Sequence, residues 1–542
     1  MRNMRNLCKL IVLVLTLTTV LSGCTSQMNL PESNDPRPVS ENTAAAESGN
    51  SVSAEALASE NAEEEADYAA IVPVSCKQES CDKSSEDDRL YVQGSYDILG
   101  VSADGFERLN ESLQSLNKER QEEIVSQVDE YYEMGVSDIE AGDIPDEWLS
   151  FSSEYHADVV RSDEQLVSIL EIFYSFAGGA HPNTYYRSVN FDTKTGKKLG
   201  IEDVVSDREA FIKSLEEETL KSIDKDMLIV DNVSEVIKEL MDETVSENEL
   251  TFIMDYEGLE VVFSPYELTA YAAGAQRVRL SYADYPELFD AGYMAAPQNY
   301  IEKVYEGGRY YTGRSGTGDR KEVTLEELSD EYGTISSCTV LLDGKAGQAD
   351  TEDYYYNSRM YIAHMGDKSF CIVEKQSDND YTFMTIYDLN SDTAVKKGTV
   401  DGHIDSMTMP ADPAALRIVK RCNLLSTYSV VQLHRLNEDG SVTPIEDFGY
   451  MENEDMPSHR LKKTISVNML DDEEGKSMHE VTLGSQTELK VYRTDLDKIV
   501  DMKLKDGNVV RLVVEYGEDE FYGQMVDNTP IEEVFEEVWF AG

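Results

Sequence analysis

One candidate for a catalytic or binding residue in this sequence is a histidine in a glycine-rich loop. His181 follows Gly178 and Gly179 closely, and Pro182 comes directly after it. The glycines can adopt backbone conformations that are closed to other residues, and the proline fixes the chain beside the histidine. Loops held in one shape on a sheet commonly carry binding or catalytic residues. His181 could act as a base if a carboxylate lay within reach; the alternative is a structural turn with a surface histidine.

Elsewhere in the sequence, residues of the types used in catalysis form no recognisable catalytic motif. The seven histidines show no metal-ligand spacing, and His-Glu-x-x-His and Cys-x-x-Cys are absent. The glycine-rich residues 307–318 lack both the Gly-Lys-Ser/Thr ending of a phosphate loop and the Gly-x-Ser-x-Gly nucleophile spacing. Asp378-Asn379-Asp380 lacks the glycine and distal glutamate of a calcium loop, although acidic loops could still hold calcium. We therefore predict no cofactor, no metal and no catalytic residue, and enzymatic activity stays open but disfavoured.

The amino terminus predicts export and attachment to a membrane. Three basic residues precede an apolar stretch at residues 10–20, as in a signal peptide, and the stretch is too short to span a bilayer comfortably. Residues 21–24, Leu-Ser-Gly-Cys, match the lipobox of bacterial lipoproteins, which implies cleavage before Cys24 and a lipid on its thiol. We expect residues 1–23 to be the signal peptide and the mature chain to be extracytoplasmic, anchored to the bacterial cell membrane through Cys24.

The charge of the chain restricts its partners. Lys and Arg number 47 against 106 Asp and Glu, and loss of the three basic residues of the signal lowers the net charge from −59 to −62. General nucleic-acid binding needs cations that neutralise phosphate, so it is excluded. Strong acidity favours cationic partners, either metal ions or a basic protein, and speeds encounter with them. Acidity that serves only solubility is the alternative.

Composition divides the mature chain into a linker and several domains. Residues 24–88 are dominated by Ser, Ala, Glu, Asn and Pro, so they predict a disordered acidic linker. Within it, Cys76 and Cys81 are close enough in sequence to form a disulfide in an oxidising compartment. The ~450 residues that remain are too many for one core. We expect folded domains at residues 89–295, 320–480 and 485–542.

Hydrophobic patterns predict an α+β domain around His181. Strands are expected at residues 166–176 and 185–191, with the loop of His181 between them. Apolar residues at helical spacing predict a helix from Phe106 that ends at Gly135. Further strands are expected at 90–99, 154–161, 250–263 and 278–280, and further helices at 206–223 and 233–241. This pattern is typical of an antiparallel sheet with helices on one face.

From residue 335 onward the pattern is mainly β. Strands are expected at 337–342, 369–375, 381–388, 415–420 and 429–436, and a small barrel at 489–492, 499–504, 509–516 and 521–525. Thr529 and Pro530 predict the capped start of a final helix whose apolar face extends to Val538. No function for residues 300–542 follows from these patterns.

Two motifs resemble a known extracellular domain. The first is Tyr174-Ser-Phe-Ala-Gly-Gly-Ala-His-Pro-Asn-Thr-Tyr-Tyr-Arg187, followed by Asn190-Phe-Asp-Thr-Lys-Thr-Gly-Lys-Lys-Leu199. The second is Phe263-Ser-Pro-Tyr-Glu-Leu268 with Tyr271-Ala-Ala-Gly274 and the strand after it. Together they look like the domain of the RsiV and PdaC type, which combines DUF4163-like and DUF3298-like parts. The resemblance covers about residues 90–290.

The resemblance implies an accessory binding module. In RsiV, an anti-sigma factor, this domain captures lysozyme, and in PdaC it precedes a separate peptidoglycan deacetylase domain. This chain lacks the cytoplasmic anti-sigma segment and the membrane helix of the former. It also lacks the Thr-Phe-Asp-Asp-Gly and His-x-x-x-His patterns with which polysaccharide deacetylases hold their metal. Neither signalling of that type nor deacetylation is therefore implied here.

The family motif and the local chemistry together predict a ligand-binding site. Its candidate residues are Ser175, Gly178, Gly179, His181, Asn183, Tyr185, Tyr186, Pro265 and Tyr266. A shaped loop with aromatic residues beside it could enter the sugar-binding cleft of a cationic lysozyme and anchor there. We therefore expect capture of lysozyme or another cell-wall-directed ligand, for protection or sensing. The alternatives are a module that binds peptidoglycan fragments or other carbohydrates through its tyrosines, and an accessory of a cell-wall hydrolase.

Overall fold

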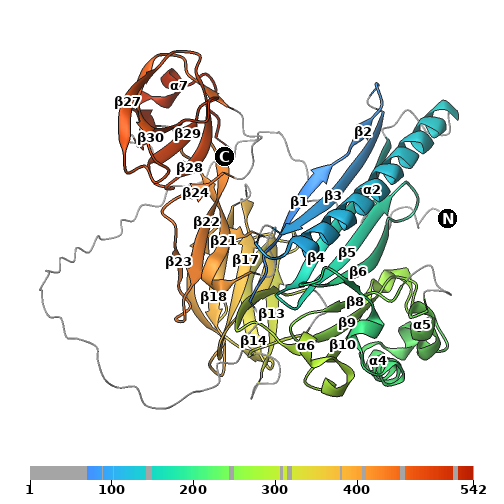
Figure 1. Ribbon diagram of the computed structural model, residues 1–542. Coiled ribbons are helices and arrows are strands. Elements are labelled where there is room, and N and C mark those ends of the chain that lie inside the picture. The colour runs from blue at the N-terminus through green and yellow to red at the C-terminus, as the bar shows by residue number, and fades with distance from the viewer. Residues whose placement is uncertain are drawn as a thin grey trace, which may run out of the picture. The chain divides into compact units, whose positions relative to one another are not determined.

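The structure is a computed structural model of the chain (Figure 1). It describes residues 70–87, 89–101, 103–141, 149–242, 249–305, 309–313, 320–378, 381–405, 411–451, 458–516 and 523–540. The expected signal peptide, Cys24 and most of the expected linker lie outside these residues. Among the described helices, none is both long enough and apolar enough to cross a membrane.

A seven-stranded sheet forms the amino-terminal part of the described chain. Its strands are β1 (Val74–Ser80), β2 (Lys83–Ser84), β3 (Leu90–Val101), β4 (Leu149–Ser162), β5 (Leu166–Phe176), β6 (Asn183–Asp192) and β7 (Lys198–Leu199). They follow the order β1-β3-β4-β5-β6-β7, with β2 paired to β3. The β3–β4 pair is parallel and its neighbours are antiparallel, because the helix α2 connects β3 to β4 as a crossover.

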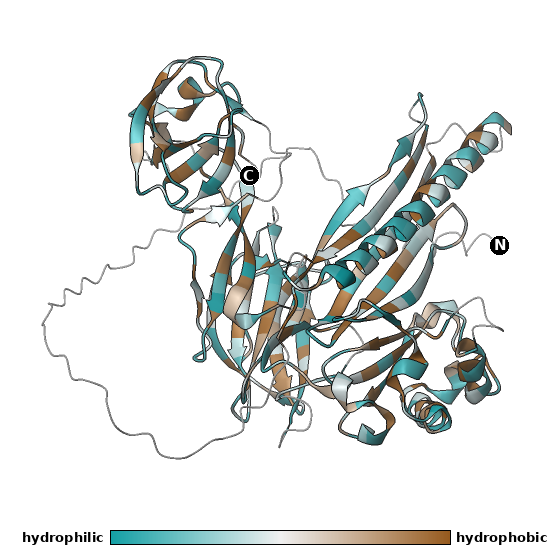
Figure 2. Ribbon diagram, in the orientation of Figure 1, coloured by the Kyte–Doolittle hydropathy of each residue, from teal (hydrophilic) through white to brown (hydrophobic). Residues whose placement is uncertain are grey.

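The helix α2 (Glu107–Ala141) covers one face of this sheet (Figure 1). Most of its buried residues are apolar and recur at helical spacing, and Figure 2 shows apolar positions along an otherwise polar helix. The helix continues past Gly135, where the sequence predicts its end. Gly135 is buried, and a Cβ atom there would lie 2.6 Å from Leu90 Cδ1, so this glycine allows close packing on β3 and does not terminate the helix.

A smaller unit packs on the opposite face of the sheet. Its elements are α3 (Ile201–Val204), α4 (Arg208–Ser222), η1 (Lys225–Met227), α5 (Val233–Leu240), β8 (Phe252–Met254), β9 (Gly258–Phe263), η2 (Tyr271–Ala273), β10 (Gln276–Ser281), η3 (Pro286–Leu288) and α6 (Ala291–Met294). The strands form an antiparallel sheet in the order β10-β9-β8, and the helices α4 and α5 share its core. The strand expected at 250–263 is divided, because Asp255 Oδ1 accepts from the backbone of Glu257 and Gly258 and turns the chain.

Side chains of the large sheet hold β8 in place. Asn190 donates to the carbonyl of Phe252, and the hydroxyls of Ser188 and Ser168 accept from the backbone N–H groups of Phe252 and Met254. An apolar cluster that includes Leu170 and Val262 lies between the two sheets. The described part of residues 90–290 is therefore α+β, as the sequence predicts, with a helix on one face of the large sheet and a second small sheet on the other.

Two further sheets follow along the chain. Their strands are β11 (Asn299–Lys303), β12 (Tyr310–Tyr311), β13 (Glu322–Ser329), β14 (Ile335–Leu342), β15 (Lys345–Ala346), β16 (Asn357–Met365), β17 (Lys368–Gln376), β18 (Thr382–Asp388) and β19 (Val395–Asp401). One sheet has the order β12-β13-β14-β15 and the other has the order β11-β16-β17-β18-β19. They enclose a core that contains Cys338, Cys371 and Tyr387.

The last part of the chain forms a thirteen-stranded sheet. Its elements are β20 (His403–Ile404), η6 (Pro413–Ala415), β21 (Leu416–Cys422), β22 (Tyr428–Leu436), β23 (Val442–Pro444), β24 (Gly449–Tyr450), β25 (His459–Arg460), β26 (Ile465–Leu470), β27 (Met478–Leu483), β28 (Glu488–Thr494), β29 (Ile499–Lys503), β30 (Val509–Glu515), β31 (Met525–Val526), β32 (Thr529–Pro530) and α7 (Ile531–Val534). Strand β24 pairs with both β22 and β28, so hydrogen bonding continues across the domain boundary expected near residue 485.

The described strands of this region follow an open order, and no pairing among them closes a barrel. The prediction for the end of the chain needs correction. The final helix is a single turn, α7, because Phe535 leaves the helix to bridge Leu461. Pro530 is its N-cap residue, and Thr529 lies in a strand and does not cap the helix.

The folded part begins earlier than residue 89. Strand β1 pairs along its whole length with β3, inside the stretch expected to be linker. Most of its residues are polar because it is an edge strand, so the sequence lacks the alternation of apolar and polar residues that predicts a strand. Cys76 lies within this extended strand and Cys81 just beyond its end, and both thiols are free in the structure, without the disulfide that the sequence allows.

Candidate functional site

The loop at residues 177–182 lies at the end of the β5–β6 hairpin. Strand pairing stops at Ser175 and Asn183, and the loop beyond this pair is outside the hydrogen-bond ladder. Gly178 and Gly179 have φ angles of 82° and 107°, which favour glycine, and both residues are exposed. The sequence correctly predicts a shaped loop at this position.

His181 stacks on Tyr271, which comes from the short helix η2. Their ring centroids are 4.0 Å apart and the planes are inclined by 21°. The carbonyl of Pro182 accepts from Nδ1 of His181 at 2.8 Å and from the hydroxyl of Tyr271 at 2.7 Å. One carbonyl therefore orients both rings, although the two residues are separated by ninety positions in the chain.

Tyr266 adds a third ring to this stack. Its centroid lies 5.8 Å from that of Tyr271, and 58% of the residue is exposed. Its φ angle is 77°, an uncommon value for a tyrosine, and its backbone N–H donates to Thr269 within a tight turn. We call His181, Tyr266 and Tyr271 the aromatic surface.

Hydrogen bonds fix the turn of Tyr266 to the hairpin. Glu267 accepts from the backbone N–H of Ser264 at 2.8 Å, which closes the turn. The hydroxyl of Ser264 accepts from the backbone N–H of Tyr186 on β6 at 3.1 Å. Burial raises the pKa of Glu267 to about 7, so its protonation changes near neutral pH. The two sequence motifs thus form one connected site.

Several predicted residues do not contribute to the aromatic surface. Tyr185 faces α2, where it stacks on Phe173 with centroids 4.7 Å apart, and Tyr186 lies on the other face against the small sheet. Ser175 is buried. Asn183 is exposed at the base of the loop, and Pro265 is half-buried beside Tyr266. Tyr271 is a member of the aromatic surface that is not among the residues predicted from the sequence, although it lies within the second motif.

The surroundings of His181 do not favour acid–base catalysis. Its hydrogen-bond partner is a backbone carbonyl, which cannot serve as the orienting carboxylate of a catalytic pair. His156 does lie near carboxylates, 3.6 Å from Asp97 and 3.5 Å from Glu154. Hydrogen bonds to these two groups raise its pKa to about 10, so the ring is protonated at neutral pH and cannot act as a base. Among the described residues, no group of His, Cys, Asp and Glu is arranged to hold a metal ion.

Two concave sites lie on opposite faces of the β17–β18 hairpin. One is a polar pocket of about 160 Å³, and the other is a groove of about 580 Å³. The groove is lined by Glu352, Asp353, Tyr354, Ser377, Asp378, Tyr381, Phe383, Thr399 and Asp401. Its aromatic and acidic lining gives the β-rich region, to which the sequence assigns no function, a surface suited to binding.

Comparison with known proteins identifies one part of the chain. Residues 202–283 match a family described as a protein of unknown function, DUF3298. The chain carries a DUF3298 domain. The DUF3298 domain contains Tyr266 and Tyr271, whereas His181 precedes it. No curated protein matches the sequence.

Two solved structures that are similar to part of this chain are DUF3298 family proteins. One, from Pseudomonas aeruginosa PAO1, is 15% identical with a TM-score of 0.28, and the match covers 42% of this chain and 97% of that one. Another, from Bacteroides fragilis NCTC 9343, is 16% identical with a TM-score of 0.30, and the match covers 41% of this chain and 94% of that one.

Proposed function

We propose that this protein is a lipid-anchored cell-surface protein that captures a cationic, cell-wall-directed protein, with lysozyme as the specific candidate. The observation that carries the proposal is the aromatic surface, in which the exposed His181 and Tyr266 flank the half-buried Tyr271 and hydrogen bonds hold the stack in place. Rigid aromatic side chains are effective anchors because they bury a large area at a small entropic cost. The resemblance to the domain of the RsiV and PdaC type supports lysozyme as the ligand.

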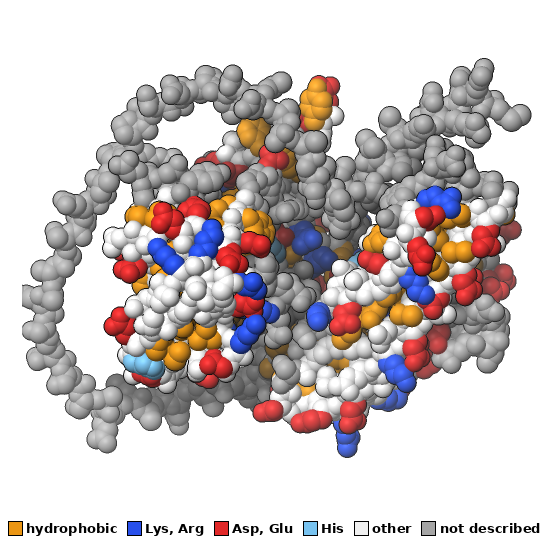
Figure 3. Space-filling model, turned by 90° about the horizontal axis from the view of Figure 1, so that it is seen from above, with side chains coloured by type: hydrophobic (Ala, Val, Ile, Leu, Met, Phe, Trp, Pro, Cys, Tyr) orange, Lys and Arg blue, Asp and Glu red, His pale blue; other side chains and the backbone are white. Residues whose placement is uncertain are grey.

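The charge of the chain supports a basic partner. Lysozymes are cationic, and the net charge of −59 would attract them over a distance of about 10 Å at ordinary ionic strength. Acidic side chains are spread over the face seen in Figure 3 and do not gather in one patch. Attraction of this kind steers encounter, and the aromatic surface would supply the contacts that retain the ligand.

The test is binding of the soluble chain, residues 25–542, to hen-egg-type lysozyme at low and physiological salt. We expect the association rate to fall with salt while the dissociation rate changes little, and muramidase activity to be inhibited in parallel. Binding that vanishes at physiological salt would indicate only non-specific attraction between opposite charges, and would contradict the proposal.

Substitutions locate the contact. We expect Tyr266→Ala and Tyr271→Ala each to weaken binding at least about tenfold, because each removes a ring of the aromatic surface. Tyr271→Phe keeps the ring but removes the hydroxyl that donates to Pro182, so it should have a smaller effect. Tyr332→Ala, at a tyrosine that is 83% exposed on another part of the chain, is the matched control and should change nothing.

Binding of peptidoglycan fragments is the second candidate function. The groove with Tyr354, Tyr381 and Phe383 favours it, because aromatic faces stack on sugar rings and carboxylates accept from sugar hydroxyls. If soluble fragments bind and lysozyme does not, and if Tyr381→Ala abolishes binding while Tyr271→Ala does not, this function replaces the first.

A further inference from the structure

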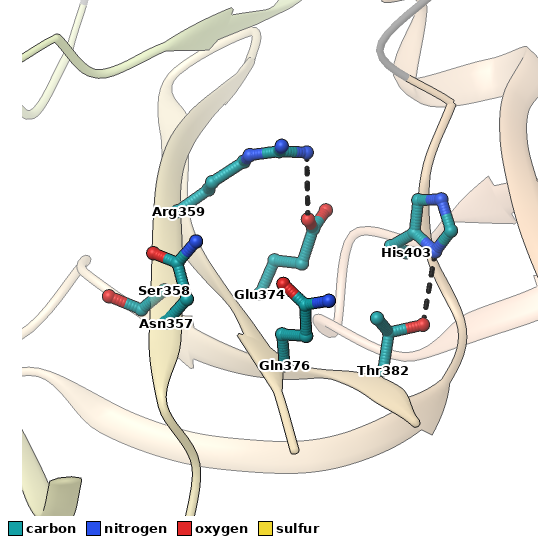
Figure 4. Close-up of a pocket in the computed structure, with 7 residues that line it drawn as sticks. All are labelled: Asn357, Ser358, Arg359, Glu374, Gln376, Thr382 and His403. Atoms are coloured by element: carbon teal, nitrogen blue, oxygen red, sulfur yellow. Dashed lines mark hydrogen bonds and ion pairs between the residues drawn. The ribbon is translucent and has the colours of Figure 1, made fainter. Parts of the chain in front are cut away.

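The polar pocket in the β-rich region lies apart from the aromatic surface and is not needed for capture of a protein. It opens on one face of β16, β17 and β18, and His403 of β20 lies across from Arg359 (Figure 4). The lining side chains are Asn357, Ser358, Arg359, Glu374, Gln376, Thr382 and His403. All of them are polar, so the pocket differs from the apolar cavities that incomplete packing leaves in a core.

Strand register explains why most of these side chains converge; Ser358 is the exception, because it points away from the pocket (Figure 4). Arg359 lies opposite Glu374, and Gln376 lies opposite Asn357 on one side and Thr382 on the other. Cross-strand neighbours of this kind point to the same face of a sheet. The polar groups are therefore fixed by three hydrogen-bonded strands, in the way that a preorganised site requires.

The charges in the pocket cancel. The carboxylate of Glu374, a residue only 5% exposed, accepts from the backbone N–H of Ile404 at 3.1 Å and from Arg359 at 3.4 Å. His403 shares a hydrogen bond of 3.0 Å with the hydroxyl of Thr382, and burial lowers the pKa of its ring, which is therefore neutral at neutral pH. One cation and one anion remain, so neither an anion nor a cation is attracted by a net charge.

We propose that this pocket binds a small, uncharged molecule rich in hydroxyl groups, of the size of a single sugar unit. The volume of about 160 Å³ equals that of about five water molecules. Arg359 and the amides of Asn357 and Gln376 donate hydrogen bonds, while Glu374 and the amide oxygens accept them. A hydroxyl group both donates and accepts, so neighbouring hydroxyls on one ring satisfy such a mixed lining.

The experiment is saturation-transfer NMR and calorimetry on the soluble chain, with glucose, N-acetylglucosamine and inorganic phosphate as separate probes. We expect at least one sugar to bind, with a dissociation constant of about 1 mM, and phosphate not to bind. Gln376→Ala and Asn357→Ala remove exposed lining amides without disturbing the core, and each should weaken sugar binding about tenfold. Tyr332→Ala, at an exposed residue that lines neither of the two concave sites, is the control and should leave binding unchanged.

Three outcomes would overturn the proposal. The first is that neither sugar binds. The second is that a sugar binds equally well to both amide variants, since another surface would then hold it. The third is that phosphate binds and Arg359→Gln abolishes this binding, which would make the pocket an anion site. None of these outcomes depends on whether the aromatic surface captures a protein.

Discussion

Tyr185 and Tyr186 illustrate what a sequence reveals about a site and what it does not. Side chains of adjacent residues in a strand point to opposite faces, so these two tyrosines could not both join one surface. That restriction is readable from the sequence once the strand is predicted. The stack of His181 on Tyr271 is not, because it depends on how a turn in one sheet meets a loop of another. Local motifs therefore identify the loop and the turn, and only the fold brings them together.

Glu267 links the shape of the aromatic surface to pH. Burial raises its pKa from 4.5 to about 7, so the folded chain holds the proton more tightly than the unfolded chain. Its contribution to the free energy of unfolding is fully present below about pH 4.5 and is lost as the pH rises through about 7. Glu267→Gln imitates the protonated form. We expect the difference in unfolding free energy between the variant and the unmodified chain to grow, in favour of the variant, by about 2 kcal/mol as the pH rises from about 5 to about 8.

Chemical denaturation at several pH values measures this difference. Comparing the variant with the unmodified chain at each pH removes the contribution of other buried carboxyl groups, such as Glu257 and Glu302, whose pKa values burial also raises. A difference in stability that stays constant with pH would contradict the prediction.

The elements of residues 90–290 are largely predictable because their patterns are strong. Strands β3 to β6 and helices α4 and α5 all appear where β-branched residues or helical spacing place them. The errors in the predicted elements arise where the role of a residue in packing cannot be inferred from its type. Gly135 is an example, since glycine commonly follows the end of a helix but here provides space. Strand β1 is another, since an edge strand needs few apolar residues.

Gly135→Ala tests the packing of α2 on the sheet. Alanine gains about 1 kcal/mol of helix propensity over glycine. Its Cβ would nevertheless lie 2.6 Å from Leu90 Cδ1 and 3.1 Å from Phe151 Cε2. Overpacking of this kind costs about 1–3 kcal/mol, so after the gain in helix propensity we expect a net loss of up to about 2 kcal/mol of stability in urea denaturation. Ser137→Ala, at an exposed position of the same helix, should be neutral or slightly stabilising. A stabilised Gly135→Ala would show that the contact with Leu90 relaxes freely.

Across the whole chain, the DUF3298 match does not coincide with a complete folding unit. Leu166 and Leu199 precede residue 202 and belong to the core of the small sheet. Serine hydroxyls of β5 and β6 accept hydrogen bonds from the backbone N–H groups of β8. After residue 283, Glu302 and Arg320 join a buried group of charges: Arg320 donates to Glu257 in the turn before β9, and Asp255 of the same turn and Arg279 of β10 act on Glu302. The match therefore marks a segment whose stability depends on neighbours on both sides.

Truncation tests this dependence. We expect a fragment of residues 202–283 to show no cooperative unfolding transition by circular dichroism, because its sheet would expose an apolar face and leave backbone groups without partners. The chain from residue 66 onward should unfold cooperatively. Removing residues 66–88 as well should lower its stability, since β1 would be lost from the edge of β3. A cooperative transition in the short fragment would contradict the prediction.

The position of the loop at residues 177–182 has a consequence for evolution. Because strand pairing ends at Ser175 and Asn183, residues beyond that pair can be exchanged, lengthened or shortened without altering the register of the sheet. The turn that carries Tyr266 is connected to β6 through the hydroxyl of Ser264, which accepts from the backbone N–H of Tyr186, so the side chain at position 266 can change without loss of this hydrogen bond. Homologous chains can therefore acquire new ligands by changing a few loop residues while the framework stays the same. A diversity of ligands within one fold is the expected result, and the identity of the loop, more than the fold, would then distinguish one member from another.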